Sequence, residues 1–195
     1  MINAGTLSAM GTGLTSNLKT EQVAALTALQ VKALSSDTIG NLGTSQVDAL
    51  SASQWMSVST SAMAALSTAQ VAQISTSELQ SLSAAQVKAL SADAVTSLTT
   101  ARLASFKVAQ VQAFSTAQVA ALSTGQVQAL SAAAAPGLTT DAVKGLSNNQ
   151  VQALTTSALA AMTTTQVGAL TSGQVTALTS TEAAALTTTQ VRSEE

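Results

Sequence analysis

The side chains best suited to catalysis or metal binding in this 195-residue chain are its carboxylates, because it contains nine Asp and Glu but no His and no Cys. Without His and Cys there is no imidazole base, no thiolate nucleophile and no ordinary zinc, haem or iron–sulfur site. Two carboxylates can still perform general acid–base catalysis when they flank a substrate in a shielded cleft. The spacing of the carboxylates therefore decides whether catalysis is expected.

The carboxylates are too dispersed for that chemistry. Apart from Glu194 and Glu195, the closest two are Asp37 and Asp48, and the sequence pattern places the carboxylates on outward-facing positions. Neither an EF-hand loop nor a glycine-rich calcium nonapeptide occurs. The many Ser and Thr hydroxyls have no base to activate them. The sequence predicts a protein that is not an enzyme, with no catalytic residue, cofactor, metal site or small-molecule substrate.

The composition excludes further partners. Charged residues make up 8% of the chain, against about 25% in average soluble proteins. Seven scattered Lys and Arg form no basic stripe, so no nucleic-acid partner is expected. No apolar run approaches the roughly 20 residues of a membrane span, and no cleavable signal peptide is visible at the N-terminus.

An eight-residue repeat runs from Ile2 to Leu186 without insertion or deletion, with the consensus Leu-[Ser/Thr]-[Thr/Ala]-x-Gln-Val-x-Ala. Its Leu column is apolar in every octad. Its Val column is Val or another large apolar residue, with Thr15, Ala135 and Ala183 as exceptions. Each octad is therefore expected to occupy an equivalent place in one repetitive structure.

Three structures could accommodate this period. A continuous helix is disfavoured, because an apolar stripe repeating every eight residues rotates by about 80° per repeat. A β-solenoid is the alternative to keep, although Leu and the Val five residues later would face opposite sides of a straight strand. A solenoid of very short helices fits best. In Leu26–Val31, Thr27 would be the N-cap, Gln30 would complete a capping box, and Leu26 and Val31 would form the hydrophobic staple. The predicted fold is all-α, a solenoid of capped octad helices.

The repeat is imperfect in three places, which define the expected organisation. Residues 1–18 form atypical N-terminal repeats, a cap or hook; residues 19–191 form the solenoid; and residues 192–195 form a C-terminal tail. Within the solenoid, Pro136 predicts a local kink near 131–138. The repeat continues almost to the C-terminus without a polar cap, so either the chain is part of a longer array or its open end meets another molecule.

Two sets of residues have both a structural and a functional interpretation. Trp55, Phe106 and Phe114 fall in the apolar columns, where core packing is favoured over stacking on a ligand. Thr recurs directly after the cap position in many octads and would form a row of hydroxyls and methyls. This row suggests an alternative function as an ice- or surface-binding module.

Self-association is the expected interaction of this chain. Surfaces that keep proteins monomeric are about 25–35% charged, well above this composition. Because every octad presents the same surface, a contact displaced by one repeat need not close into a ring and leads to open filaments. The copies could stack end to end or pack laterally. For end-to-end stacking, the residues predicted to join copies are Leu7 and Met10 at the N-terminal end and Leu178 and Leu186 at the C-terminal end.

The recurring run Ala-Leu-[Ser/Thr]-Thr-x-Gln-Val-x-Ala-Leu, seen from Ala113 to Leu130 and from Ala161 to Leu178, resembles short-repeat tracts of large bacterial secreted and cell-surface proteins. These include long adhesin-like chains exported without a cleaved N-terminal signal. The resemblance covers the chain from about Lys19 to Val191. It implies an extracellular or cell-surface structural role, a filament, sheath or spacer, and it carries over no functional residue.

Overall fold

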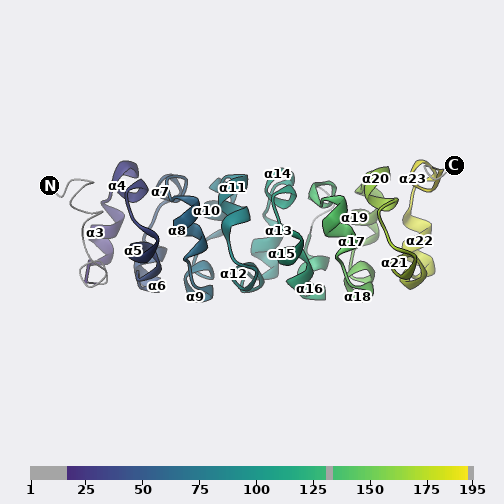
Figure 1. The fold of residues 1–195 in the computed structure, drawn as a ribbon, viewed down its shortest axis with the longest axis horizontal. Helices are drawn as coiled ribbons and strands as arrows, with labels where there is room; N and C mark the ends of the chain where they lie inside the picture. Colours follow the sequence, from purple (N-terminus) through teal and green to yellow (C-terminus); the bar gives the residue numbers. More distant parts are fainter. Residues whose placement is uncertain (1–16, 131–133, 193–195) are drawn as a thin grey trace. The chain divides into compact units, whose positions relative to one another are not determined.

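The computed structural model describes residues 17–130 and 134–192, and all regular structure in these ranges is helical. The all-α prediction is confirmed, and the β-solenoid alternative is wrong. Leu7 and Met10, and most of the predicted N-terminal cap, lie outside the described residues. The chain divides at Leu98 and Thr99 into two compact units, which are described separately (Figure 1).

In unit 1, one short helix forms per octad. The helices are α3 (Thr20–Ala24), α4 (Ala28–Lys32), α5 (Ser36–Gly40), α6 (Thr44–Asp48), α7 (Ala52–Trp55), α8 (Thr60–Ala64), α9 (Thr68–Val71), α10 (Thr76–Ser81), α11 (Ala84–Ala89) and α12 (Ala92–Thr96). Each helix packs on the third helix after it, as α3 does on α6, α6 on α9 and α9 on α12. In Figure 1, α6, α9 and α12 follow one another along the lower edge of this unit. Three octads therefore make one turn of the solenoid.

Unit 2 repeats this arrangement. Its elements are α13 (Thr100–Ala104), α14 (Val108–Gln112), α15 (Thr116–Ala121), α16 (Thr124–Gln128), the 3₁₀ helix η1 (Ala135–Gly137), α17 (Thr140–Lys144), α18 (Asn148–Gln152), α19 (Thr156–Ala161), α20 (Thr164–Val167), α21 (Ser172–Ala177), α22 (Ser180–Ala185) and α23 (Thr188–Arg192). Three stacks of helices run through it: α13, α16, α18 and α21; α14, η1, α19 and α22; and α15, α17, α20 and α23.

The predicted capping box forms at the start of helices in this fold. The Thr27 hydroxyl accepts from the Gln30 backbone N–H at 3.3 Å, and Gln30 Oε1 accepts from the Thr27 backbone N–H at 2.8 Å. Where the cap residue is Lys19, Gly43 or Lys107, the Gln side chain still accepts from the cap N–H. Because the two bonds satisfy N–H groups that a helix leaves free at its start, they favour helices too short to form alone.

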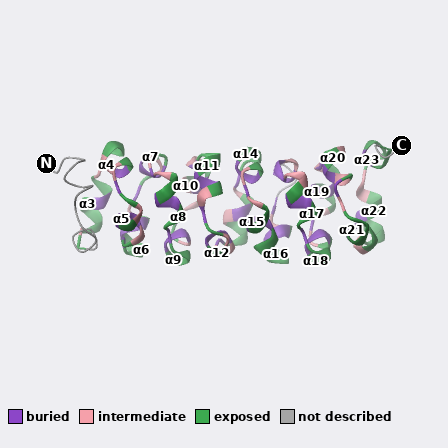
Figure 2. Cartoon of the chain, viewed as in Figure 1, coloured by how far each residue is buried: buried purple, intermediate pink, exposed green. Residues whose placement is uncertain are grey.

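The Leu and Val columns form the core of each unit. Val71, Leu79, Val119 and Leu159 are completely buried, and Figure 2 shows buried segments on the inner side of the helices. Trp55 is 0% exposed and is the largest fully buried side chain. Phe106 and Phe114 pack edge to face with ring centroids 5.3 Å apart. These placements support core packing, the structural interpretation of the aromatic residues.

The Pro136 octad forms a 3₁₀ helix where other octads form an α-helix. Pro136 lies at the start of η1, where the N–H that proline lacks is not needed. Gly137 packs so closely on α14 that a Cβ atom there would lie 2.4 Å from the Val108 carbonyl oxygen. The octad is thus accommodated by a tighter helix and a close backbone approach.

Candidate self-association surface

The interface between successive turns is built from a column of buried glutamine side chains. In unit 1, Gln54 Nε2 donates to the carbonyl oxygens of Val23 at 3.0 Å and Leu26 at 2.8 Å. The Leu26 carbonyl lies past the end of a helix in the preceding turn, where no helical N–H remains to bind it, and the Val23 carbonyl also accepts from the Leu26 N–H at 3.1 Å. The same Gln54 side chain accepts from the Ser51 N–H at 2.7 Å. One side chain therefore caps its own helix and the helix below it.

Other glutamines at this position repeat the pattern in both units. Gln70 donates to Ile39 and Leu42, Gln86 to Trp55 and Val58, Gln150 to Val119 and Leu122, Gln174 to Val143 and Leu146, and Gln190 to Leu159 and Met162. The donor and acceptor are 28 or 31 residues apart in each case. Because burying an unpaired carbonyl is costly, these bonds specify the register between turns as well as holding them together. The sequence predicts that each glutamine caps its own helix, but it does not predict that the glutamine also donates to carbonyls of the preceding turn.

Glu182 occupies the glutamine position in α22 and is only 6% exposed, which corrects the prediction that the carboxylates face outward. Its Oε2 accepts from the Thr179 N–H at 2.7 Å, as a glutamine oxygen would. An ionised carboxylate is an acceptor only and cannot donate to the carbonyls of the preceding turn. The equivalent carbonyls in this octad, those of Val151 and Leu154, consequently receive no such bond.

Replacing Glu182 by Gln is expected to raise the free energy of unfolding by about 1 kcal/mol, because the amide adds a donor for the Val151 and Leu154 carbonyls. Urea unfolding followed by far-UV circular dichroism measures the change. Glu21→Gln, at an exposed position in the first turn of α3, is the matched control and should change the stability by less than about 0.5 kcal/mol. An unchanged or lower stability of Glu182→Gln would show that the inter-turn donor is unimportant here.

The last described turn leaves its apolar face uncovered. Val175 in α21 and Val191 in α23 are 51% and 61% exposed, whereas equivalent residues such as Val71 and Val119 inside the units are completely buried. Ala183, at the same position in α22, is also exposed. This surface, comprising Val175, Ala183 and Val191, is called the terminal face below. It matches the surface that every interior turn buries against the next.

Leu178 and Leu186 lie beside the terminal face but are half-buried at the ends of α21 and α22. Of the four residues predicted to join copies, these two are placed close to an uncovered apolar surface. Val175 and Val191 are the more exposed members and were missed because the repeat pattern assigns them to the core. Their place on the side of a turn that faces the next turn, rather than their residue type, distinguishes them.

The Thr column after the cap is divided into three rows, because consecutive octads lie on different sides of the turn. Thr20, Thr44 and Thr68 stack on α3, α6 and α9 in unit 1. A second row, in unit 2, is carried by α15, α17, α20 and α23 and consists of Thr116, Thr140, Thr164 and Thr188. The single row expected from the sequence is therefore replaced by rows that repeat every third octad.

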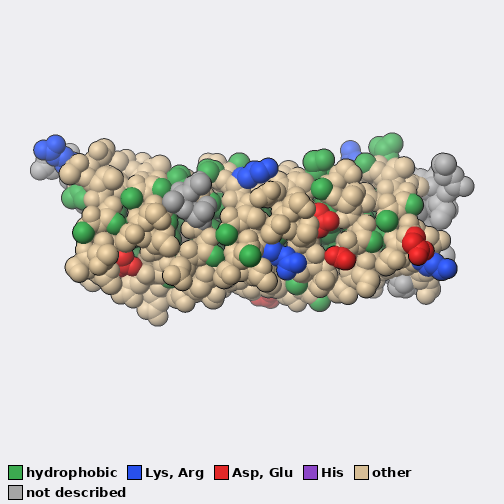
Figure 3. Space-filling view, turned by 180° about the vertical axis from the view of Figure 1, so that it is seen from behind, with side chains coloured by type: hydrophobic (Ala, Val, Ile, Leu, Met, Phe, Trp, Pro, Cys, Tyr) green, Lys and Arg blue, Asp and Glu red, His purple; other side chains and the backbone are tan. Residues whose placement is uncertain are grey.

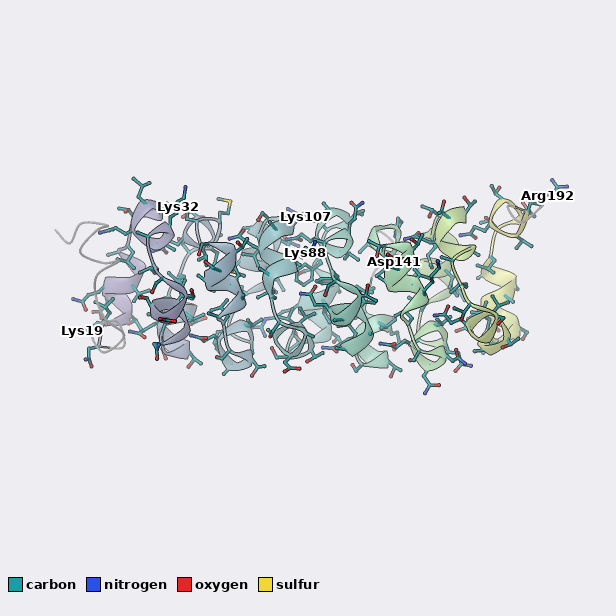
Figure 4. All side chains as sticks on the ribbon, viewed as in Figure 1. Lys19, Lys32, Lys88, Lys107, Asp141 and Arg192 are labelled. Carbon is teal, nitrogen blue, oxygen red and sulfur yellow. The ribbon has the colours of Figure 1, made fainter. Side chains whose placement is uncertain are left out.

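Charged side chains are sparse along the described chain. Figure 4 labels six of them, Lys19, Lys32, Lys88, Lys107, Asp141 and Arg192, each in a different octad. The face shown in Figure 3 consists mainly of uncharged side chains and backbone, with few charged residues. Among residues 17–130 and 134–192, no group of three or more acidic side chains could hold a metal ion. No helix within the described ranges is long and apolar enough to cross a membrane.

The fold and the inter-turn glutamines define a helical repeat protein built from octapeptides. Residues 100–132 and 149–188 match the ALTTAQ repeat, and both matches lie within unit 2. None of the curated proteins compared with the chain matches it. The ALTTAQ matches support the short-repeat region inferred from the octad period.

Proposed function

We propose that this chain is a non-enzymatic structural protein that associates end to end into filaments or sheaths, or serves as a spacer, outside a bacterial cell. The repetitive and sparsely charged surface is the observation that carries this proposal, because a contact that suits one octad also suits the next. Val175 and Val191 are exposed apolar residues, and a second copy of the chain offers octad surfaces of the same design on which to cover them.

Burial of the exposed valines would stabilise a contact between copies. Full burial of a valine side chain contributes about 1.5 kcal/mol or more, so covering Val175 and Val191 favours association. The small number of charges removes the repulsion that usually keeps proteins apart. A contact displaced by one octad joins unlike surfaces, so it is heterologous and need not close into a ring.

The double substitution Val175→Asp and Val191→Asp is expected to abolish self-association, because it places two carboxylates on the surface to be buried. Sedimentation velocity over a range of protein concentrations measures the effect. Both valines are more than half exposed, so the fold should be retained, with unchanged far-UV circular dichroism.

The matched control adds the same charge elsewhere. Thr181→Asp with Thr189→Asp places carboxylates at exposed first-turn positions of α22 and α23, away from the terminal face. This control should associate like the unaltered chain. Equal association of the valine double variant would remove the terminal face from the proposal. Leu178 and Leu186 are less suitable targets, because they are half-buried within their own turn.

The cell-surface location is supported by the resemblance of the octads to repeat tracts of bacterial secreted proteins. It is also consistent with a chain that lacks Cys and so cannot form unwanted disulfides during export. Immunogold labelling of intact bacteria expressing the chain is the direct test of this location. Label confined to the cell interior would refute it.

Ice or surface binding is the second candidate, and the stacking of Thr116, Thr140, Thr164 and Thr188 in unit 2 is the observation that favours it. Regularly stacked hydroxyls and methyls could order water at a surface. Thermal hysteresis separates the two functions, because a filament has none. If hysteresis is present, Thr164→Lys with Thr188→Lys should remove it, whereas lysines at Thr76 and Thr124, which belong to other stacks, should not.

A further inference from the structure

The turns of unit 1 are joined to one another in series. Each helix packs on the third helix after it, so a turn is held by the turn on either side of it. Buried glutamines supply the hydrogen bonds between successive turns. Gln70 Nε2, for example, donates to the carbonyl oxygens of Ile39 at 2.9 Å and Leu42 at 2.8 Å. One interface between turns can therefore open while the others stay intact.

A turn that parts from its neighbours cannot keep its helices. The helices of unit 1 are four to six residues long, and helices this short are unstable alone in water. A turn consists of three octads, which span roughly 80 Å as extended chain but add only about 10 Å to a stack of helices. Opening one turn therefore lengthens the chain by about 70 Å.

Two features of the sequence favour a rapid return to the folded form. The chain has no Cys, so no disulfide forms between turns, and its one proline, Pro136, lies in unit 2. Proline isomerisation, a slow step in many folding reactions, is therefore absent from unit 1. The bonds between turns also join residues close in sequence, 28 or 31 positions apart, and short separations of this kind favour fast folding.

We propose that this chain is an extensible element, in which tension draws out the solenoid turn by turn and release of the tension rewinds it. This goes beyond the proposed association between copies, because the extension takes place within a single copy. The glutamine column determines the force at which turns part, since its bonds run from one turn to the next. Turns with fewer of these bonds open at lower force.

Glu78 is a weak position in the column of unit 1. It occupies the glutamine position of α10, where its Oε2 accepts from the Ser75 N–H at 2.8 Å. An ionised carboxylate cannot donate to the carbonyls of Val47 and Leu50, which lie 31 and 28 residues before it, as Ile39 and Leu42 lie before Gln70. A donor added at position 78 should therefore raise the force needed to part these turns.

Stretching single molecules between two points of unit 1 tests the extension. Glu21→Cys and Asp93→Cys place handles at exposed, equivalent positions of α3 and α12, three turns apart on one stack of helices. Because the full chain has no other Cys, the handles attach only there. Optical tweezers should record successive steps of about 7 nm, one for each turn, with superimposable stretching and relaxation curves at slow pulling. A single step of about 21 nm would show that unit 1 unfolds as a whole, which would overturn the inference.

Variants of the handle-bearing chain test the glutamine column. Gln70→Ala should lower the force of a step, whereas Gln73→Ala, at an exposed position outside the column, should leave it unchanged. Glu78→Gln supplies the missing donor and should raise the force, whereas Ser77→Gln, at the exposed neighbouring position, should not. Forces equal to those of the controls for both column variants would overturn the role given to the column.

The outcomes separate this inference from the proposed association. A chain that forms filaments but opens in a single step keeps the proposed function and loses the extension. A chain that opens turn by turn but stays monomeric at every concentration keeps the extension and loses the filament.

Discussion

Replacing Gln86 by Ala is expected to lower the free energy of unfolding of unit 1 by about 2–4 kcal/mol. The Gln86 side chain accepts from the Ser83 N–H at 2.9 Å and donates to the carbonyls of Trp55 at 2.7 Å and Val58 at 2.8 Å. Its removal leaves the Ser83 N–H and the Val58 carbonyl without these partners, each at a cost of about 1–3 kcal/mol, whereas the Trp55 carbonyl keeps its bond from the Val58 N–H. Trp55 is the only tryptophan, so its fluorescence during urea unfolding reports on this unit.

Two further variants identify the cause. Gln86→Glu keeps an acceptor for the Ser83 N–H but has no proton to donate, so it should also destabilise unit 1 if the inter-turn bonds matter. Gln73→Ala changes an exposed glutamine outside this column and should stay within about 0.5 kcal/mol of the unaltered chain. Gln86→Ala as stable as Gln73→Ala would refute the role assigned to the glutamine column.

Trp55→Val should cost about 2–4 kcal/mol, although it restores the residue that most octads have at this position. Trp55 is 0% exposed, so the surrounding side chains are packed around an indole, and a valine leaves a cavity. Trp55→Phe should cost less. It keeps most of the volume, and the indole Nε1 that it removes has no hydrogen-bond partner. Thermal unfolding followed by circular dichroism measures both. A more stable Trp55→Val would show that the octad consensus, rather than local packing, determines stability here.

The sequence predicts the local structure of each octad well, because the signals for it are local. The Thr27–Gln30 pair illustrates this, since both bonds of the capping box join residues three apart. The alternation of Leu and Val columns likewise predicts which side chains are buried. These features depend on backbone geometry within one octad and not on the rest of the chain.

The number of octads per turn could not be predicted from the same signals. It depends on the angle between consecutive helices, which is set by packing across residues some 24 positions apart. One signal in the sequence does point to contacts between turns: the capping box uses only the acceptor oxygen of each glutamine side chain, so the amide donor is expected to bind elsewhere. The buried position of Glu182 follows from the same cause, since its column faces the preceding turn.

The candidate surface was predicted only in part for a related reason. Leu178 and Leu186 are predicted from the sequence to join copies at the C-terminal end, but their position at the ends of α21 and α22 leaves them half-buried. The more exposed residues, Val175 and Val191, depend on which side of a turn faces the next turn. That direction follows from the stacking of helices and not from residue type.

Electron microscopy of the purified, unaltered chain shows whether copies of it associate into filaments. We expect filaments that lengthen with protein concentration and persist in high salt, because the contact between copies is apolar rather than ionic. Dispersed monomers at every concentration and salt condition would contradict it.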